Sequence, residues 1–181
     1  VGPLGYNGSK AAMELISKAD VVLALGTRLN PFSTLPGYGI DYWPKKATII
    51  QVDMNPDRIG LTKKVSVGIC GDAKQVAQQI LDKLSSDAGN TGREERKNLI
   101  HKTKSAWLQT LSGLDHEEDD PGTVWNKEAR ERDKDRMSPR QAWRAIQDAL
   151  PQDAIISSDI GNNCAIGNAY PTFEKPRKYL A

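Results

Sequence analysis

Apolar residues in the first 86 positions follow two alternating patterns, one with helical spacing and one in short continuous runs. Across residues 12–19 apolar side chains recur at helical spacing, and Ser9 stands before them as a helix cap. The next run, residues 21–26, is apolar at every position. A strand that is apolar on both faces is typical of the interior of a parallel sheet. The pattern therefore predicts a helix followed by a buried strand.

The alternation continues with two more strands and a second helix. Strands are predicted at 48–53 and 65–69, and Asp72 then caps a helix whose third position is Gln75. Apolar residues at helical spacing between 76 and 84 form one face of that helix. Three interior strands need neighbours, so we expect further strands of the same sheet to precede Val1.

Residues 87–137 differ from the segments on either side. Nine of the ten residues from 127 to 136 are charged, which indicates a solvated connector. Within this connector, residues 93–111 fit an amphipathic helix, because a few apolar side chains fall on one side of it. The apolar positions expected to face inward are Ile100, Trp107, Leu108 and Leu111.

A second α/β unit begins at Ser138. Ser138 is the expected cap, a proline occupies the first helical position, and Gln141 completes a capping box. A strand at 154–159 runs into Gly161. The expected buried stripe of the helix consists of Ala142, Ala145, Ile146, Ala149 and Leu150. We expect 1–86 to belong to one domain, 87–137 to be a linker, and 138–181 to begin a second domain.

Composition limits the possible partners and the compartment. The 25 basic and 23 acidic residues are interspersed and give a net charge of +2, so nucleic acid is not expected as a partner. The longest apolar run, 21–25, is far shorter than the roughly 20 residues of a membrane span. Cys70 and Cys164 lie far apart without metal-ligand spacing, which favours a reducing cytoplasm.

The carboxyl ends of the predicted strands are candidate ligand sites, because ligands of open parallel sheets bind there. Arg28 after Gly26 could pair with a diphosphate, and Asp53 could accept hydrogen bonds from ribose hydroxyls, so a nucleotide site is conceivable. The same residues also fit structural roles as a glycine turn, a polar strand end and a solvated arginine. Because no G-x-G-x-x-G motif is present, the structural roles are favoured.

A second candidate lies at Gly161, Asn162 and Asn163, directly after the strand of the second unit. A glycine there permits a phosphate to approach the backbone closely, and two side-chain amides can donate hydrogen bonds. An ordinary turn between strand and helix explains the same residues. The residues alone leave both interpretations open.

Several segments together resemble the thiamine diphosphate enzymes of the acetolactate synthase group. Three segments resemble their central domain, and a fourth resembles the strand and loop of their third domain that hold the cofactor diphosphate. The segments are 19–28, 50–60, 67–74 and, for the third domain, 157–165. The resemblance implies a partial parallel Rossmann-like sheet followed by the first αβ unit of another α/β domain.

The resemblance also implies the cofactors and their ligands. Thiamine diphosphate and Mg²⁺ are expected in the full-length enzyme, with Gly161, Asn162 and Asn163 at the diphosphate, although the group usually has Gln and His at the two Asn positions. The group's catalytic glutamate and its magnesium motif would lie outside this chain. We therefore expect an internal fragment that holds no metal ligand, whose catalytic residues remain unknown, and that is inactive by itself.

Three further stretches, 2–10, 29–39 and 161–170, are more similar to an acetyltransferase branch of the group than to its synthases. This resemblance implies that the full-length enzyme converts sulfoacetaldehyde and phosphate to acetyl phosphate and sulfite in taurine degradation. A homo-oligomer, dimer or tetramer, is expected. An acetolactate synthase-like enzyme, and a nucleotide-binding or purely structural central domain, remain the alternatives.

Overall fold

The computed structural model describes residues 1–5, 8–84, 91–115, 135–159, 161–170, 173 and 175–180. At 114, 115, 162, 163 and 180 only the backbone is described. Most of the charged segment 127–136 therefore lies outside the described residues. The chain forms two compact units, one comprising Pro3–Lys104 and the other Ser105–Ala181, and each is considered by itself.

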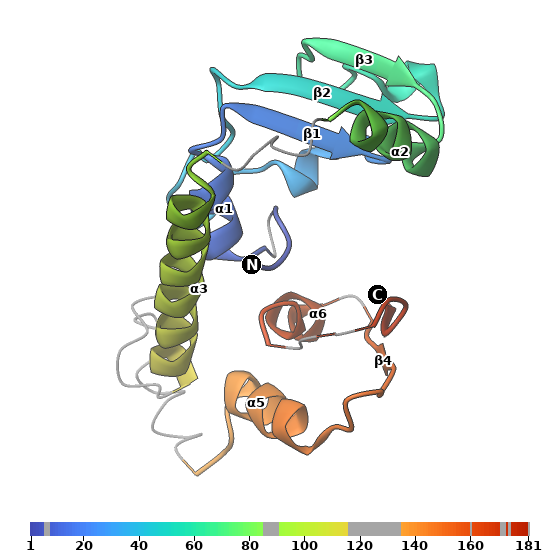
Figure 1. Cartoon of the computed structure of the whole chain (residues 1–181). Coiled ribbons are helices and arrows are strands. Elements are labelled where there is room, and N and C mark those ends of the chain that lie inside the picture. Colours follow the sequence, from blue (N-terminus) through green and yellow to red (C-terminus); the bar gives the residue numbers. More distant parts are fainter. Residues whose placement is uncertain are drawn as a thin grey trace. The chain divides into compact units, whose positions relative to one another are not determined.

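The first unit contains a three-stranded parallel sheet with the order β1-β2-β3 (Figure 1). Its strands are β1 at Val21–Leu25, β2 at Thr48–Asp53 and β3 at Val67–Cys70. In the ladder, Val21 is the partner of Thr48 and Ile50 is the partner of Val67. The expected parallel α/β sheet is confirmed, although β3 begins two residues later than predicted.

Helices begin where the sequence places their caps. The first unit has α1 at Lys10–Ile16, short 3₁₀ helices at Pro31–Ser33 and Pro56–Arg58, and α2 at Ala73–Lys83. Ser9 Oγ accepts a hydrogen bond from the Ala12 N–H at 3.4 Å, and Asp72 Oδ1 accepts one from the Gln75 N–H at 2.9 Å. Both predicted caps are confirmed.

The two faces of the sheet are covered to different extents. On one face, Ala24, Leu29 and Ile49 form a buried cluster, around which partly buried side chains pack. On the other face α2 lies against β2, whereas Val21 and Leu23 of β1 are 56% and 43% exposed. Among the described residues β1 pairs with β2 alone, so β1 is an edge strand of this sheet, and its expected second neighbour stays a prediction.

Helix α3, Arg93–Asp115, is the helix expected within the connector, and its residues are divided between the two units. Trp107 and Leu111 are buried as predicted, but Ile100 and Leu108 are 44% and 46% exposed. Thr103, one turn before Trp107, is the buried residue that the apolar pattern missed. In the described part of the chain, no helix has both the length and the apolar character needed to cross a membrane.

The second unit contains α5 at Pro139–Ala149, β4 at Ile156–Ser157, α6 at Asn162–Gly167 and β5 at Tyr179–Leu180. Ser138 and Gln141 form the predicted capping box. Strand β4 pairs with β5 in parallel and is shorter than the predicted 154–159.

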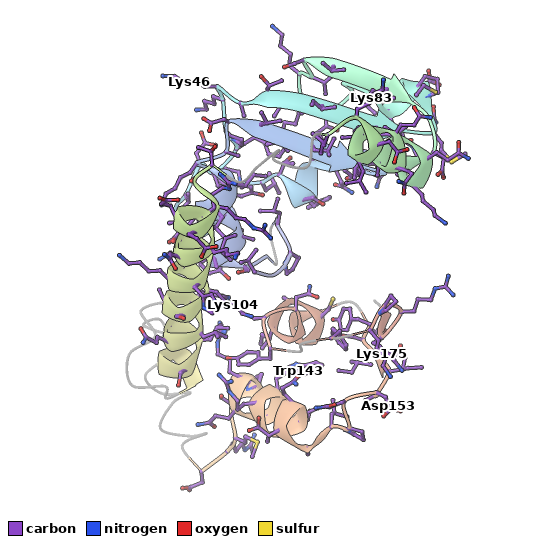
Figure 2. The ribbon with its side chains drawn as sticks, in the orientation of Figure 1. Lys46, Lys83, Lys104, Trp143, Asp153 and Lys175 are labelled. Carbon is purple, nitrogen blue, oxygen red and sulfur yellow. The ribbon has the colours of Figure 1, made fainter. Side chains whose placement is uncertain are left out.

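Helix α5 does not bury the stripe that its sequence predicts. Ala145, Ile146 and Ala149 are exposed, and Trp143 instead packs on α6 (Figure 2). A Cβ built on Gly167 would lie only 2.7 Å from Cζ2 of Trp143. Helix α5 therefore approaches α6 through an aromatic ring seated on a glycine, a contact that apolar periodicity alone cannot reveal.

Candidate cofactor and ligand sites

The carboxyl ends of the three strands meet at one edge of the sheet. Past the strands, the Gly26 N–H donates to the Val52 carbonyl at 2.8 Å, and the Gly71 N–H donates to the Asp53 carbonyl at 3.1 Å. Gly26 has a φ of +62°, a conformation that glycine adopts at little cost. The structure thus brings together the strand ends that the sequence selected.

Gln51 connects the loops at this edge, although it was not among the site residues predicted from the sequence. Its side chain is 1% exposed, and its Nε2 donates to the carbonyls of Thr27 at 3.0 Å and Arg58 at 3.1 Å. Its Oε1 accepts from the Gly60 N–H at 2.8 Å. The side chain therefore ties the loop after β1 to the loop after β2. A glutamine between the apolar residues Ile50 and Val52 was the available signal.

Asp53 and Arg28, the two other residues of the conceivable nucleotide site, have different surroundings. Asp53 is 7% exposed, and its Oδ1 accepts a hydrogen bond from the Asn55 N–H at 2.8 Å. This bond closes a turn, which gives the carboxylate a structural role. Arg28 is exposed, and its carbonyl accepts a hydrogen bond from the Thr62 hydroxyl at 3.4 Å. These contacts explain Gly26 and Asp53 without a ligand.

The second candidate site lies between β4 and α6. Gly161 is exposed, with φ +139° and ψ −169°, and a Cβ built on it would meet nothing within 4 Å. Only the backbone conformation, and not space, therefore disfavours a side chain at this position. Asn162 and Asn163 open α6, and their side chains lie outside the described part of the structure.

The backbone at Gly161 fits an anionic group. The first N–H groups of an α-helix have no acceptor within the helix, and no side chain caps the start of α6. A cavity of about 260 Å³ in the same unit differs, because the described residues of its lining, which include Leu150, Ile156 and Phe173, carry no charge. Of the two places, the Gly161 backbone is the one suited to a diphosphate.

Comparison with known proteins shows what the chain is similar to. Residues 1–80 match the model of the thiamine pyrophosphate enzyme central domain. The whole chain is 80% identical, over 181 residues, to a probable sulfoacetaldehyde acetyltransferase of Rhizobium meliloti. The chain therefore resembles thiamine pyrophosphate enzymes over its whole length.

Other relatives separate two branches of the family. A sulfoacetaldehyde acetyltransferase of Roseovarius nubinhibens is 77% identical over 99% of the chain, whereas an acetolactate synthase large subunit of Escherichia coli is 25% identical over 99% of it. The resemblance seen in the sequence is confirmed, and so is the parallel sheet of a central domain. The chain spans 31% of the length of the Rhizobium relative, 30% of the Roseovarius relative and 28% of the Escherichia relative.

The match to the thiamine pyrophosphate enzyme central domain supports thiamine diphosphate as the cofactor. Among the described residues, no three His, Cys, Asp or Glu side chains gather into a group that could hold a metal ion.

Proposed function

We propose that the full-length protein carrying this chain is a thiamine diphosphate-dependent acetyltransferase that converts sulfoacetaldehyde and phosphate to acetyl phosphate and sulfite. The observation that carries the proposal is the contrast in identity, 80% and 77% to proteins with the acetyltransferase name against 25% to a synthase. The reaction belongs to taurine degradation in the cytoplasm. The free thiols of Cys70 and Cys164 support that compartment.

The chain contributes cofactor binding and architecture. In this proposal 1–86 is the later part of the central domain, 87–137 a linker, and 138–181 the start of the diphosphate-binding domain. Backbone N–H groups after Gly161 donate to the cofactor diphosphate, and the side chains of Asn162 and Asn163 add two neutral donors.

When bound, thiamine diphosphate supplies the carbon nucleophile that an aldehyde substrate requires. Its Mg²⁺ is held by residues outside this chain, in a homo-oligomer of two or four subunits. The catalytic residues also lie outside the chain, so the chain by itself is inactive. Gly161 serves this site because its conformation lets the backbone face the phosphates without an intervening Cβ.

The activity is tested with the purified full-length protein, thiamine diphosphate, Mg²⁺, sulfoacetaldehyde and phosphate. We expect sulfite and acetyl phosphate to form in equal amounts, and neither to form when phosphate or cofactor is omitted. Pyruvate alone is the control substrate. Acetolactate from pyruvate without sulfite from sulfoacetaldehyde would instead support a synthase.

The cofactor site is tested by Gly161→Ala in the same protein, because a Cβ and the lost conformation should weaken thiamine diphosphate binding. Asn162→Ala and Asn163→Ala should each raise the Kd about tenfold to a hundredfold, the value of a hydrogen bond to a charged acceptor. Gly39→Ala is the matched control, since Gly39 also has a positive φ, +70°, with nothing within 4 Å of a built Cβ. Parent-like affinity in all three site variants would refute the assignment.

A further inference from the structure

Four lysines lie at the amino edge of the three-stranded sheet. Lys45 and Lys46 precede β2, and Lys63 and Lys64 precede β3. Parallel strands begin at the same edge of a sheet, and Figure 2 shows Lys46 at the amino end of β2. This basic edge is opposite the edge at which the strands end.

Packing holds the two pairs of lysines near one another. Ala47 and Val65, which adjoin Lys46 and Lys64 in the sequence, pack against the same buried cluster. Strands β2 and β3 are also hydrogen-bonded neighbours, so the segments that lead into them begin side by side. Cations held in one place attract an anion, because each adds to the local positive potential.

One lysine of each pair has a partner that favours its charged form or holds its ammonium group in place. Lys45 Nζ lies 2.8 Å from Asp41 Oδ2, and the hydrogen bond and charge of Asp41 raise the pKa of Lys45. Lys63 is half-buried, and its Nζ lies 5.3 Å from the centroid of the Trp43 ring, a cation–π contact. Lys45 and Lys63 therefore provide two fixed positive charges.

The other lysine of each pair has no such partner. Lys46 and Lys64 are exposed, and neither has a hydrogen-bond or ion-pair partner among the described residues. A lysine amine is a nucleophile only in its neutral form, which an ion pair disfavours. Each pair thus combines a held cation with an amine that is accessible for reaction.

We propose that Lys46 and Lys64 are acetylation sites for acetyl phosphate: the held charges of Lys45 and Lys63 attract its phosphate, and the free amine beside them attacks its acetyl group. Acetyl phosphate is the product of the reaction proposed above, so this inference rests on the proposed function for the source of the acyl donor. The enzyme is then modified by its own product, and each acetylation removes one positive charge from the basic edge.

The atoms and electrons of this step balance. The neutral Nζ of the lysine forms a bond to the acetyl carbon of acetyl phosphate, and the bond from that carbon to the bridging phosphate oxygen breaks. Phosphate leaves with the electron pair of the broken bond, and the nitrogen releases one proton to water. The products are acetyl-lysine and phosphate, and the step requires no oxidant or reductant.

The test treats the full-length protein with acetyl phosphate as a reagent, and mass spectrometry of its peptides gives the acetylation rate of each lysine. Lys104 of α3 is the comparison, because it is exposed, has no ion-pair partner among the described residues, and has apolar residues four positions before and after it. We expect Lys46 and Lys64 to react about three- to tenfold faster than Lys104. Lys45 should react more slowly than Lys46, because Asp41 holds it protonated.

Acetic anhydride is the control reagent, because it transfers the same acetyl group without a charge. With the anhydride, Lys46 and Lys64 should lose their advantage over Lys104. The advantage with acetyl phosphate should also fall in about 1 M salt, where the Debye length is about 3 Å. Equal rates at the three lysines with acetyl phosphate, or the same preference with both reagents, would overturn the inference.

Three variants test the role of each partner. Lys45→Gln should slow acetylation of Lys46 by acetyl phosphate, and Lys63→Gln should slow that of Lys64, while the rates with anhydride stay unchanged. Asp41→Asn should speed acetylation of Lys45, because it removes the carboxylate that raises the pKa of that amine. Parent-like rates at Lys46 and Lys64 in the two glutamine variants would show that the held charges do not recruit the phosphate.

The result does not depend on the proposed activity, because acetyl phosphate is supplied as a reagent. If the enzyme releases sulfite but Lys46 and Lys64 are not preferred, this inference fails and the proposed function stands. If both lysines are preferred but no acetyl phosphate forms from sulfoacetaldehyde and phosphate, the proposed function fails instead.

Discussion

Replacing Gln51 by leucine should detach the two loops at the carboxyl edge of the sheet. The substitution nearly preserves side-chain volume but removes three hydrogen bonds, to the Thr27 carbonyl, the Arg58 carbonyl and the Gly60 N–H. At roughly 0.5 to 1.5 kcal/mol for each bond, the local free energy of opening should fall by about 2 to 4 kcal/mol. Water does not compete for these hydrogen bonds in the folded state, because Gln51 is 1% exposed.

Amide hydrogen exchange of the full-length protein measures this change directly. Segments 26–30 and 55–62 should exchange about thirty- to several-hundredfold faster in Gln51→Leu, since each 1.4 kcal/mol is a factor of ten. Gln78→Leu is the control, because the Gln78 side chain donates to the exposed Asp82 carboxylate, and it should change exchange little. If both segments keep parent-like protection in Gln51→Leu, the side chain is not what holds the loops.

Two further predictions concern the second unit. Gly167→Ala should cost about 1 to 3 kcal/mol of stability, because the new Cβ would lie 2.7 Å from the Trp143 ring. Thermal melts measure this, and Gly113→Ala is the control, because a Cβ built on Gly113 meets nothing within 4 Å. Ser138→Ala should cost about 1 kcal/mol by removing the cap of α5, and chemical denaturation checks it against Ser138→Thr, which keeps a capping hydroxyl.

Local signals in the sequence predicted the elements well, because their physical causes are local. Ser9, Asp72 and Ser138 each satisfy N–H groups within three residues of themselves, so no distant partner is needed to see them. The strand at 48–53 was predicted with its observed bounds, since a short apolar run between turns has few other structures available.

Burial of the helix faces could not be predicted from periodicity, because it depends on what packs against each helix. Leu81 of α2 and Leu84, which caps the end of that helix, have the expected spacing but are 62% and 55% exposed. In α5, Ile146 is 45% exposed although it lies in the predicted stripe. Spacing shows which face can be buried, while the neighbouring elements decide whether it is.

The candidate sites show the same division between local and distant causes. A glycine after a strand was visible in the sequence, and Gly161 has the positive φ that makes a glycine necessary there. Gln51 was missed, because its role depends on partners in other segments of the chain. A polar side chain between apolar residues of a strand is therefore a candidate for a structural or functional role even when its partner is unknown.

Contacts within this chain do not explain why strand β1 is apolar on both of its faces. Val21, Leu23 and Leu25 lie on one face of the strand and are 56%, 43% and 39% exposed, yet all three are apolar. A strand with one face toward water would alternate apolar with polar residues along its sequence. Burial of apolar surface contributes about 25 cal/mol of stability for each Å². The apolar choice at these three positions therefore predicts that other protein covers this face. Polar substitutions here should destabilise the full-length protein more than the chain's own exposures suggest, and melts of Leu23→Ser would test this.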